Sequence, residues 1–112
     1  MKLVDKPITK KELSEMARKT FGDLIKAVVD VEEEIFVVDG EMHADEEQYL
    51  LTKGSNQNNL WGINLYPDLS GDSFIEFDSM INVRPRLNNF SQKVENPKIR
   101  QKIVAIVTKL VK

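Results

Sequence analysis

Two helical patterns enclose a series of short segments rich in β-branched residues, and this order limits the folds open to the chain. Near the N-terminal end, Thr9 and Glu12 have the spacing of a capping box, which predicts a helix over residues 10–21. Near the C-terminal end, Asn96 is followed by Pro97 at a first helical position, and apolar residues then recur at helical spacing. We therefore expect a helix at each end of the chain.

The segments between these two helices have the length and composition of β-strands. They cover residues 24–31, 34–39, 47–52, 60–65 and 73–83. The stretch 41–52 is ambiguous because its first half suits a helix start, and we favour a strand that begins near Glu47. The pattern predicts an α+β fold: a mainly antiparallel five-stranded sheet with the N-terminal and C-terminal helices packed on one face.

Composition indicates one soluble domain. The chain has 112 residues and 41% hydrophobic content, which is enough for one hydrophobic core, so we predict a single domain over residues 1–112. The absence of cysteine excludes disulfides, thiol catalysis and Cys-ligated metals. The N-terminus lacks the apolar stretch of a signal peptide, and the longest apolar run, residues 103–107, is too short to cross a bilayer. We expect a cytoplasmic protein with no membrane partner.

The two charge signs occupy different parts of the chain. Residues 27–78 hold thirteen acidic residues and only one cation, Lys53. Residues 79–112 hold eight Lys or Arg and one acid, and residues 1–26 hold seven Lys or Arg and four acids. This separation favours another protein or a weak homodimer as the partner. Nucleic-acid binding through the basic C-terminal third is a less favoured alternative, because the acidic middle and the pI of about 5.4 oppose phosphate.

One polar constellation stands out on the last predicted strand. Alternation places Glu76 and Asp78 on one face of segment 73–83, and Asn64 and Tyr66 of the preceding strand lie across from them. Residues two apart on a strand lie roughly 6.5 Å apart, so we expect that Glu76 and Asp78 together can hold one hard cation or bind a basic partner. The alternative is simple solvation, since antiparallel sheets often leave one polar face open to water.

The single histidine, His43, is followed by several carboxylates, of which Asp45 is the first. Close carboxylates would raise the imidazole pKa and make His43 a candidate acid, base or metal ligand. One histidine without cysteine cannot form an ordinary zinc site, so solvation in a loop is the competing interpretation. A Mg²⁺- or Mn²⁺-dependent hydrolase would have to combine His43 and Asp45 with Glu76 and Asp78.

Three motifs carry a resemblance to a known family. They are His-Ala-Asp at 43–45, Leu-Trp-Gly-Ile-Asn-Leu-Tyr-Pro at 60–67 and Phe-Asp-Ser-Met-Ile-Asn-Val-Arg-Pro at 77–85. Together they resemble a family of small prokaryotic proteins known only as a domain of unknown function. The resemblance covers nearly the whole chain, with segment 86–95 the least typical part. It implies no established activity, cofactor or catalytic residue.

We therefore expect a binding or regulatory module that has no catalytic activity and no cofactor. The expected contact surface comprises Asn64, Tyr66, Glu76, Asp78, His43, Asp45 and Arg84. The metal-dependent hydrolase remains the rival hypothesis. Geometry distinguishes the two, because a concave site that joins His43 to the carboxylates would favour the enzyme and a convex surface would favour binding.

Overall fold

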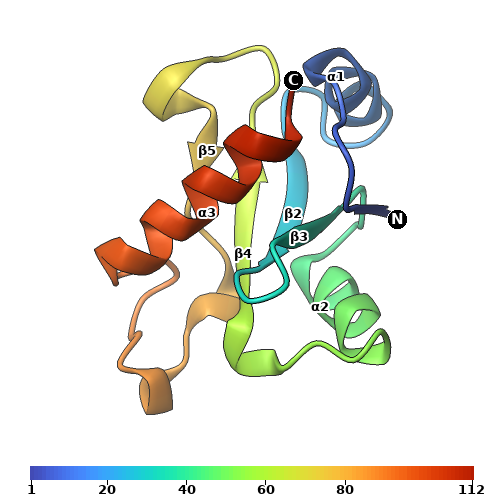
Figure 1. The fold of residues 1–112 in the computed structure, drawn as a ribbon. Coiled ribbons are helices and arrows are strands. Elements are labelled where there is room, and N and C mark those ends of the chain that lie inside the picture. Colours follow the sequence, from blue (N-terminus) through green and yellow to red (C-terminus); the bar gives the residue numbers. More distant parts are fainter.

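A five-stranded antiparallel sheet forms the centre of the protein in a computed structural model that describes residues 1–112 (Figure 1). Its strands, in the spatial order β1-β3-β2-β4-β5, are β1 (Lys2–Val4), β2 (Ile25–Asp30), β3 (Ile35–Val38), β4 (Leu60–Leu65) and β5 (Ile75–Glu76). The helices are α1 (Lys10–Lys19), α2 (His43–Thr52) and α3 (Pro97–Leu110). This architecture confirms the predicted α+β class with one five-stranded antiparallel sheet.

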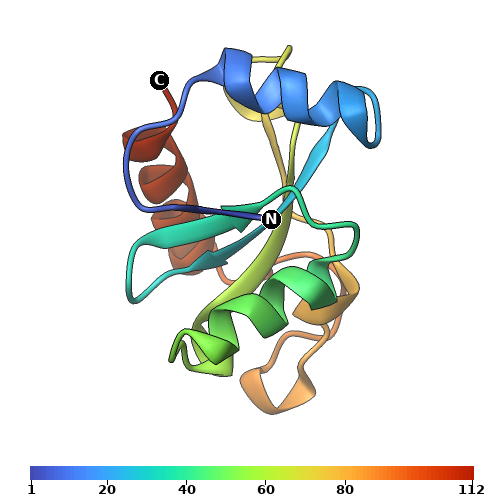
Figure 2. The same cartoon turned by 90° about the vertical axis from the view of Figure 1, so that its right-hand side faces the viewer.

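The two faces of the sheet are covered by different helices. Leu13 of α1 and Ile103 of α3 belong to the same large core cluster as Ile63 of β4. On the other face, Leu50 of α2 packs in a smaller cluster with Val28 of β2. Figure 2 shows α3 and α2 on opposite sides of the sheet. Helix α2 covers part of the second face, so the expectation that this whole face is left to solvent is wrong; the part of it near Glu76 and Asp78 stays partly exposed.

The starts of the first and last helices follow from their capping residues. The Thr9 hydroxyl accepts a hydrogen bond from the Glu12 backbone N–H at 3.0 Å, as the capping-box spacing predicts. The Asn96 side chain accepts from the Lys98 N–H at 2.9 Å, with Pro97 at the first helical position. Both local signals therefore act as the sequence indicates.

The predicted strand over residues 47–52 is wrong, because this segment is the second half of α2. Its apolar residue Leu50 is fully buried against β2, β3 and the start of β4, and Glu46, one turn earlier, is fully buried as well. Residues four apart share a helix face, so the helix places both side chains against the sheet. Packing on the sheet decides between two local structures that the sequence leaves open.

The predicted long strand over residues 73–83 is also wrong, because only Ile75–Glu76 form β5. Ser79 approaches β4 at Gly62, where a Cβ would lie 2.6 Å from both Cβ and Oγ of Ser79. Next, the Asn82 side chain accepts from the Gly62 N–H at 2.8 Å and donates to the Gly62 carbonyl at 2.9 Å. A side-chain amide thus replaces the strand partner beyond β5.

The structure contains one strand, β1, that the sequence pattern does not predict. Strand β1 pairs with β3, with Leu3 opposite Val37. It is three residues long and provides too short a pattern for recognition. None of the helices is both long and apolar enough to span a lipid bilayer.

Candidate functional site

A row of polar side chains crosses three neighbouring strands on the face that α2 covers. Lys26 of β2 lies directly opposite Asn64 of β4, and Asn64 lies directly opposite Glu76 of β5. These residues share a face with Val28 and Leu60 of the α2-side cluster, because alternate residues of a strand point the same way. We call Lys26, Asn64 and Glu76, together with Tyr66, Asp78 and His43 around them, the polar row.

Hydrogen bonds connect the part of the polar row that alternation predicts. The Asn64 side-chain amide donates to Oε1 of Glu76 at 2.9 Å and to the backbone carbonyl of Asp78 at 3.2 Å. The Tyr66 hydroxyl donates to the same Glu76 oxygen at 3.4 Å. Partial burial, and then the negative charge of Glu76, raise the Tyr66 pKa, so the hydroxyl keeps its proton. The structure thus brings Asn64, Tyr66, Glu76 and Asp78 together.

One acceptor in the polar row has no partner. Both hydrogens of the Asn64 amide point to Glu76 and Asp78, which leaves its carbonyl oxygen, Oδ1, buried without a well-aligned donor. Asn64 is only 9% exposed. Most buried polar atoms are paired, and this oxygen is enclosed by the protein's own atoms, so no outside group reaches it in this structure.

His43, the first residue of α2, reaches the polar row from the helix. Its Nε2 lies 2.8 Å from the Ile63 carbonyl, and since a carbonyl only accepts, this ring nitrogen is the donor. Burial is the largest influence and lowers the His43 pKa; Lys26 also lowers it, while Ile63, Asp78 and Asn64 act in the opposite direction. The expectation of a raised pKa is wrong, because burial outweighs the nearby carboxylate. At neutral pH the ring is uncharged and Nδ1 is an acceptor.

Two residues of the expected contact surface lie elsewhere. Asp45 is exposed on α2 and lines a separate surface pocket with Asp39 and Gly40. Arg84 is buried near the far end of β4, where it donates to the Leu60 carbonyl and to the Glu47 carboxylate at 2.8 Å. Burial lowers the Arg84 pKa and Glu47 counteracts this effect. Both residues are therefore separate from the polar row.

The ligand set of the rival hydrolase does not assemble. No group of three or more His, Cys, Asp or Glu side chains lies close enough to hold a metal ion. In addition, none of the five main surface pockets is lined by His43, Asn64 or Glu76. None of these five pockets therefore adjoins the centre of the polar row.

Glu46 is the ionisable residue that sequence reasoning did not single out. It is fully buried between α2 and the sheet; its Oε2 accepts from the Gly40 N–H at 2.9 Å, and its Oε1 has no partner. Burial raises the Glu46 pKa to about 9. Glu46 lies four residues before the apolar Leu50, and in a helix this spacing places both side chains on the same buried face. The spacing therefore predicts burial of Glu46 only if the segment is treated as a helix.

Comparisons with known proteins identify the family but no activity. Comparison with curated proteins and with solved structures gave no match. Residues 2–110 match the family described as "Protein of unknown function (DUF5674)", which confirms the resemblance carried by the three sequence motifs. The chain therefore belongs to this family of proteins of unknown function.

Proposed function

We propose that the protein is a binding module without catalytic activity, and that its polar row receives a basic group of another protein, either an ammonium or a guanidinium. The observation that carries the proposal is that Glu76 and Asp78 are both partly exposed and that no cation of the protein forms a salt bridge with either of them. A cation of a partner that reaches these two carboxylates gains charge-assisted hydrogen bonds there.

The balance of donors and acceptors in the polar row supports this choice of ligand. The donors of Asn64, Tyr66 and His43 are all directed at acceptors within the protein. The remaining groups that keep part of their surface exposed are acceptors: the neutral Nδ1 of His43 and the carboxylates of Glu76 and Asp78. Such a set matches a cation with several N–H groups, because charge-assisted hydrogen bonds are stronger than neutral ones.

The only cation within the polar row leaves this acceptor set free. The Lys26 ammonium lies over the ring of Phe21, 4.9 Å from the ring centroid, and makes no salt bridge. Glu76, Asp78 and His43 keep part of their surface exposed, so a side chain from outside can approach them. None of the five main pockets includes His43, Asn64 or Glu76, and this suits one side chain of a protein partner better than a small molecule, which usually binds in an enclosed pocket.

The test uses small cations that imitate basic side chains. Methylguanidinium and methylammonium are titrated into isotope-labelled protein, with neutral methylurea as the control of matched shape. The NMR signals of the Asn64 side-chain amide and the His43 ring are expected to shift with both cations and to stay in place with methylurea.

Matched variants identify the surface that binds these probes. Glu76→Gln combined with Asp78→Asn keeps the shape and removes two charges, and it is expected to weaken methylguanidinium binding at least fivefold. Glu33→Gln combined with Asp45→Asn removes the same charge from exposed positions outside the polar row and is expected to have no such effect. Equal shifts with methylurea would contradict the proposal. Specific shifts with Mg²⁺ alone would instead favour the metal-dependent rival.

A further inference from the structure

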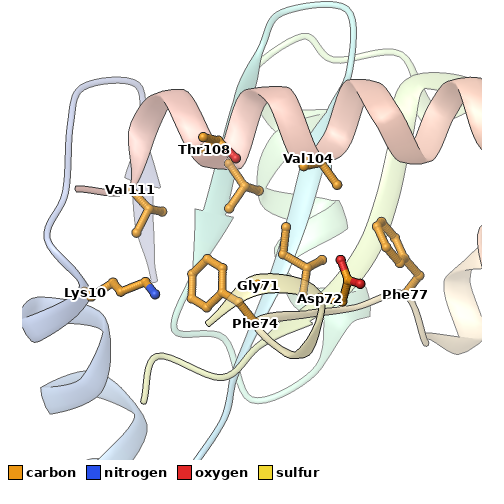
Figure 3. A pocket seen from close by; sticks show the side chains of 10 residues that line it. Lys10, Gly71, Asp72, Phe74, Phe77, Val104, Thr108 and Val111 are labelled. Carbon is orange, nitrogen blue, oxygen red and sulfur yellow. The ribbon is translucent and has the colours of Figure 1, made fainter. Parts of the chain in front are cut away.

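A second surface, on the opposite side of the sheet from the polar row, has different chemistry. A pocket with a volume of about 600 Å³ lies between α3 and the segment that contains β5. Figure 3 shows Phe74 and Phe77 of that segment opposite Thr108 and Val104 of α3, with Lys10 at one end. The lining is mainly apolar, and Val104 is 42% exposed. The pocket therefore leaves apolar side chains accessible to solvent beside α3, whose other face is buried against the sheet.

The pocket continues along α3. An adjoining hollow of about 780 Å³ shares Phe77, Val104 and Thr108 with it and extends past Arg100 to Lys109. The two hollows therefore form one trough, which we call the α3 groove. Helix α3 has 14 residues, and at 1.5 Å per residue it is roughly 21 Å long. The two hollows lie side by side along this helix, and an extended or helical segment fits such a trough better than a compact ligand.

The rim of the α3 groove is positively charged. Three cations of α3 and the residues after it line the groove: Arg100, Lys109 and Lys112. Lys10 adds a fourth cation at one end, where its ammonium lies 4.4 Å from the ring centroid of Phe74. Asp72 is the single acidic residue that lines the groove. An apolar floor between cationic edges is complementary to a segment with one apolar and one acidic face.

We infer that the α3 groove docks an acidic amphipathic helix of another protein. A second copy of this chain is a poor occupant, because its acidic helix α2 has its apolar residue Leu50 fully buried in its own fold. Nucleic acid fits less well, since single strands bind on exposed aromatic platforms, whereas Phe74 is buried and Phe77 only partly exposed, and the most exposed large apolar side chain of this groove is the aliphatic Val104.

Binding to the α3 groove is measured by isothermal titration calorimetry with four probes. They are a 14-residue Leu/Glu peptide with amphipathic helical spacing, a peptide of the same composition in scrambled order, a Leu/Lys peptide with the amphipathic spacing, and a twelve-nucleotide oligothymidine. Only the amphipathic acidic peptide is expected to bind, and NMR shifts are expected in residues 71–77 and 97–112. Equal binding of the scrambled peptide, or stronger binding of the oligonucleotide, would overturn the inference.

Two valines provide a matched pair of variants. Val104→Glu places a negative charge in the groove and is expected to weaken binding of the acidic peptide at least tenfold. Val83→Glu introduces the same change at a valine of similar exposure, 39% against 42%, outside the groove, and is expected to leave binding unchanged. Circular dichroism confirms that both variants are folded. Unchanged peptide binding by a folded Val104→Glu variant would exclude the α3 groove as the docking site.

Discussion

Gly40 and Glu46 fit each other so closely that Gly40 cannot carry a side chain. The Gly40 N–H donates to Oε2 of Glu46 at 2.9 Å, and a Cβ on Gly40 would lie 2.6 Å from Cγ of Glu46. The carboxyl group is fully buried, and burial raises its pKa to about 9. It is therefore protonated at neutral pH. The connection between β3 and α2 is held to α2 by the hydrogen bond from Gly40 to this neutral carboxylic acid.

This raised pKa predicts how stability depends on pH. Between the ordinary pKa of 4.5 and the raised value of about 9, the folded state binds a proton that the unfolded state releases. The free energy of unfolding should therefore fall as the pH rises through this range, by at most about 1.4 kcal/mol per unit from this group. Urea unfolding at pH 6 and pH 8 measures the change.

The Glu46→Gln variant isolates this contribution, because a glutamine keeps the shape and the acceptor for Gly40 but does not titrate. Its loss of stability between pH 6 and pH 8 should be smaller than that of the unmodified protein. Glu41→Gln, at an exposed position just before α2, serves as the control and should keep the original dependence. An equal pH dependence of the Glu46→Gln and unmodified proteins would show that Glu46 is ionised in the folded state.

Gly62 is predicted to tolerate no substitution while Ser79 is present. In Gly62→Ala the new Cβ would meet Ser79 at 2.6 Å, and overpacking of this kind costs about 1–3 kcal/mol of stability. The double variant with Ser79→Gly removes the clashing atoms and should recover part of the loss, as thermal unfolding of the single and double variants would reveal. Strictly additive effects would mean that the two residues do not contact each other.

The two carboxylates of the polar row should differ in their effect on stability. Glu76 accepts hydrogen bonds from Asn64 and Tyr66, whereas the side chain of Asp78 makes none. Glu76→Ala leaves the two donors without a partner and should cost about 1–3 kcal/mol. Asp78→Ala should stay within about 0.5 kcal/mol of the original. Chemical denaturation of the two single variants tests the difference, and similar effects of both would contradict the observed hydrogen bonds.

The ion pair between Arg84 and Glu47 should be important for stability. Arg84 is 7% exposed and Glu47 is 14% exposed, so Glu47→Gln leaves a nearly buried cation without its counter-charge. Breaking a buried pair in this way costs about 3 kcal/mol. Asp45→Asn removes an exposed carboxylate from the same helix and should change stability by less than about 0.5 kcal/mol. Equal melting temperatures of the two variants would show that the pair adds nothing.

Self-association is expected to depend on salt. Trp61 is 2% exposed and lies in the core, so it cannot serve as an aromatic anchor for a second copy. The remaining cause of self-association is the attraction between the acidic part of one copy and the basic part of another. This attraction weakens as the Debye length falls from about 10 Å at 0.1 M salt to about 3 Å at 1 M. Sedimentation equilibrium at these two ionic strengths should show a weak dimer that dissociates at high salt. A dimer insensitive to salt would argue against charge as its cause.

Local signals explain which parts of the fold could be predicted from the sequence. The capping residues Thr9 and Asn96 act within a few residues of their partners, so they identify the starts of α1 and α3. The pairing of Asn64 with Glu76 follows from alternation along two neighbouring strands, and this placed the main candidate residues correctly side by side.

The errors arise where distant residues decide the local structure. Residues 47–52 form a helix because Leu50 packs against β2 and β3, and no pattern inside the segment reveals that contact. The strand over residues 73–83 stops early because Ser79 meets Gly62, a residue far away in the sequence. Burial of Glu46 has the same origin, since only the position of α2 on the sheet shows that its carboxyl is enclosed.

The side chain of Asn82 has a consequence for how the protein behaves at high concentration. Strand edges with free backbone groups invite pairing with other chains and so promote aggregation and domain swapping. Here the two outer strands have only three and two residues, and the amide of Asn82 occupies both backbone groups of Gly62 where β5 has already ended. The sheet therefore offers almost no free edge, and another chain can attach to this protein through side chains but hardly by adding a strand.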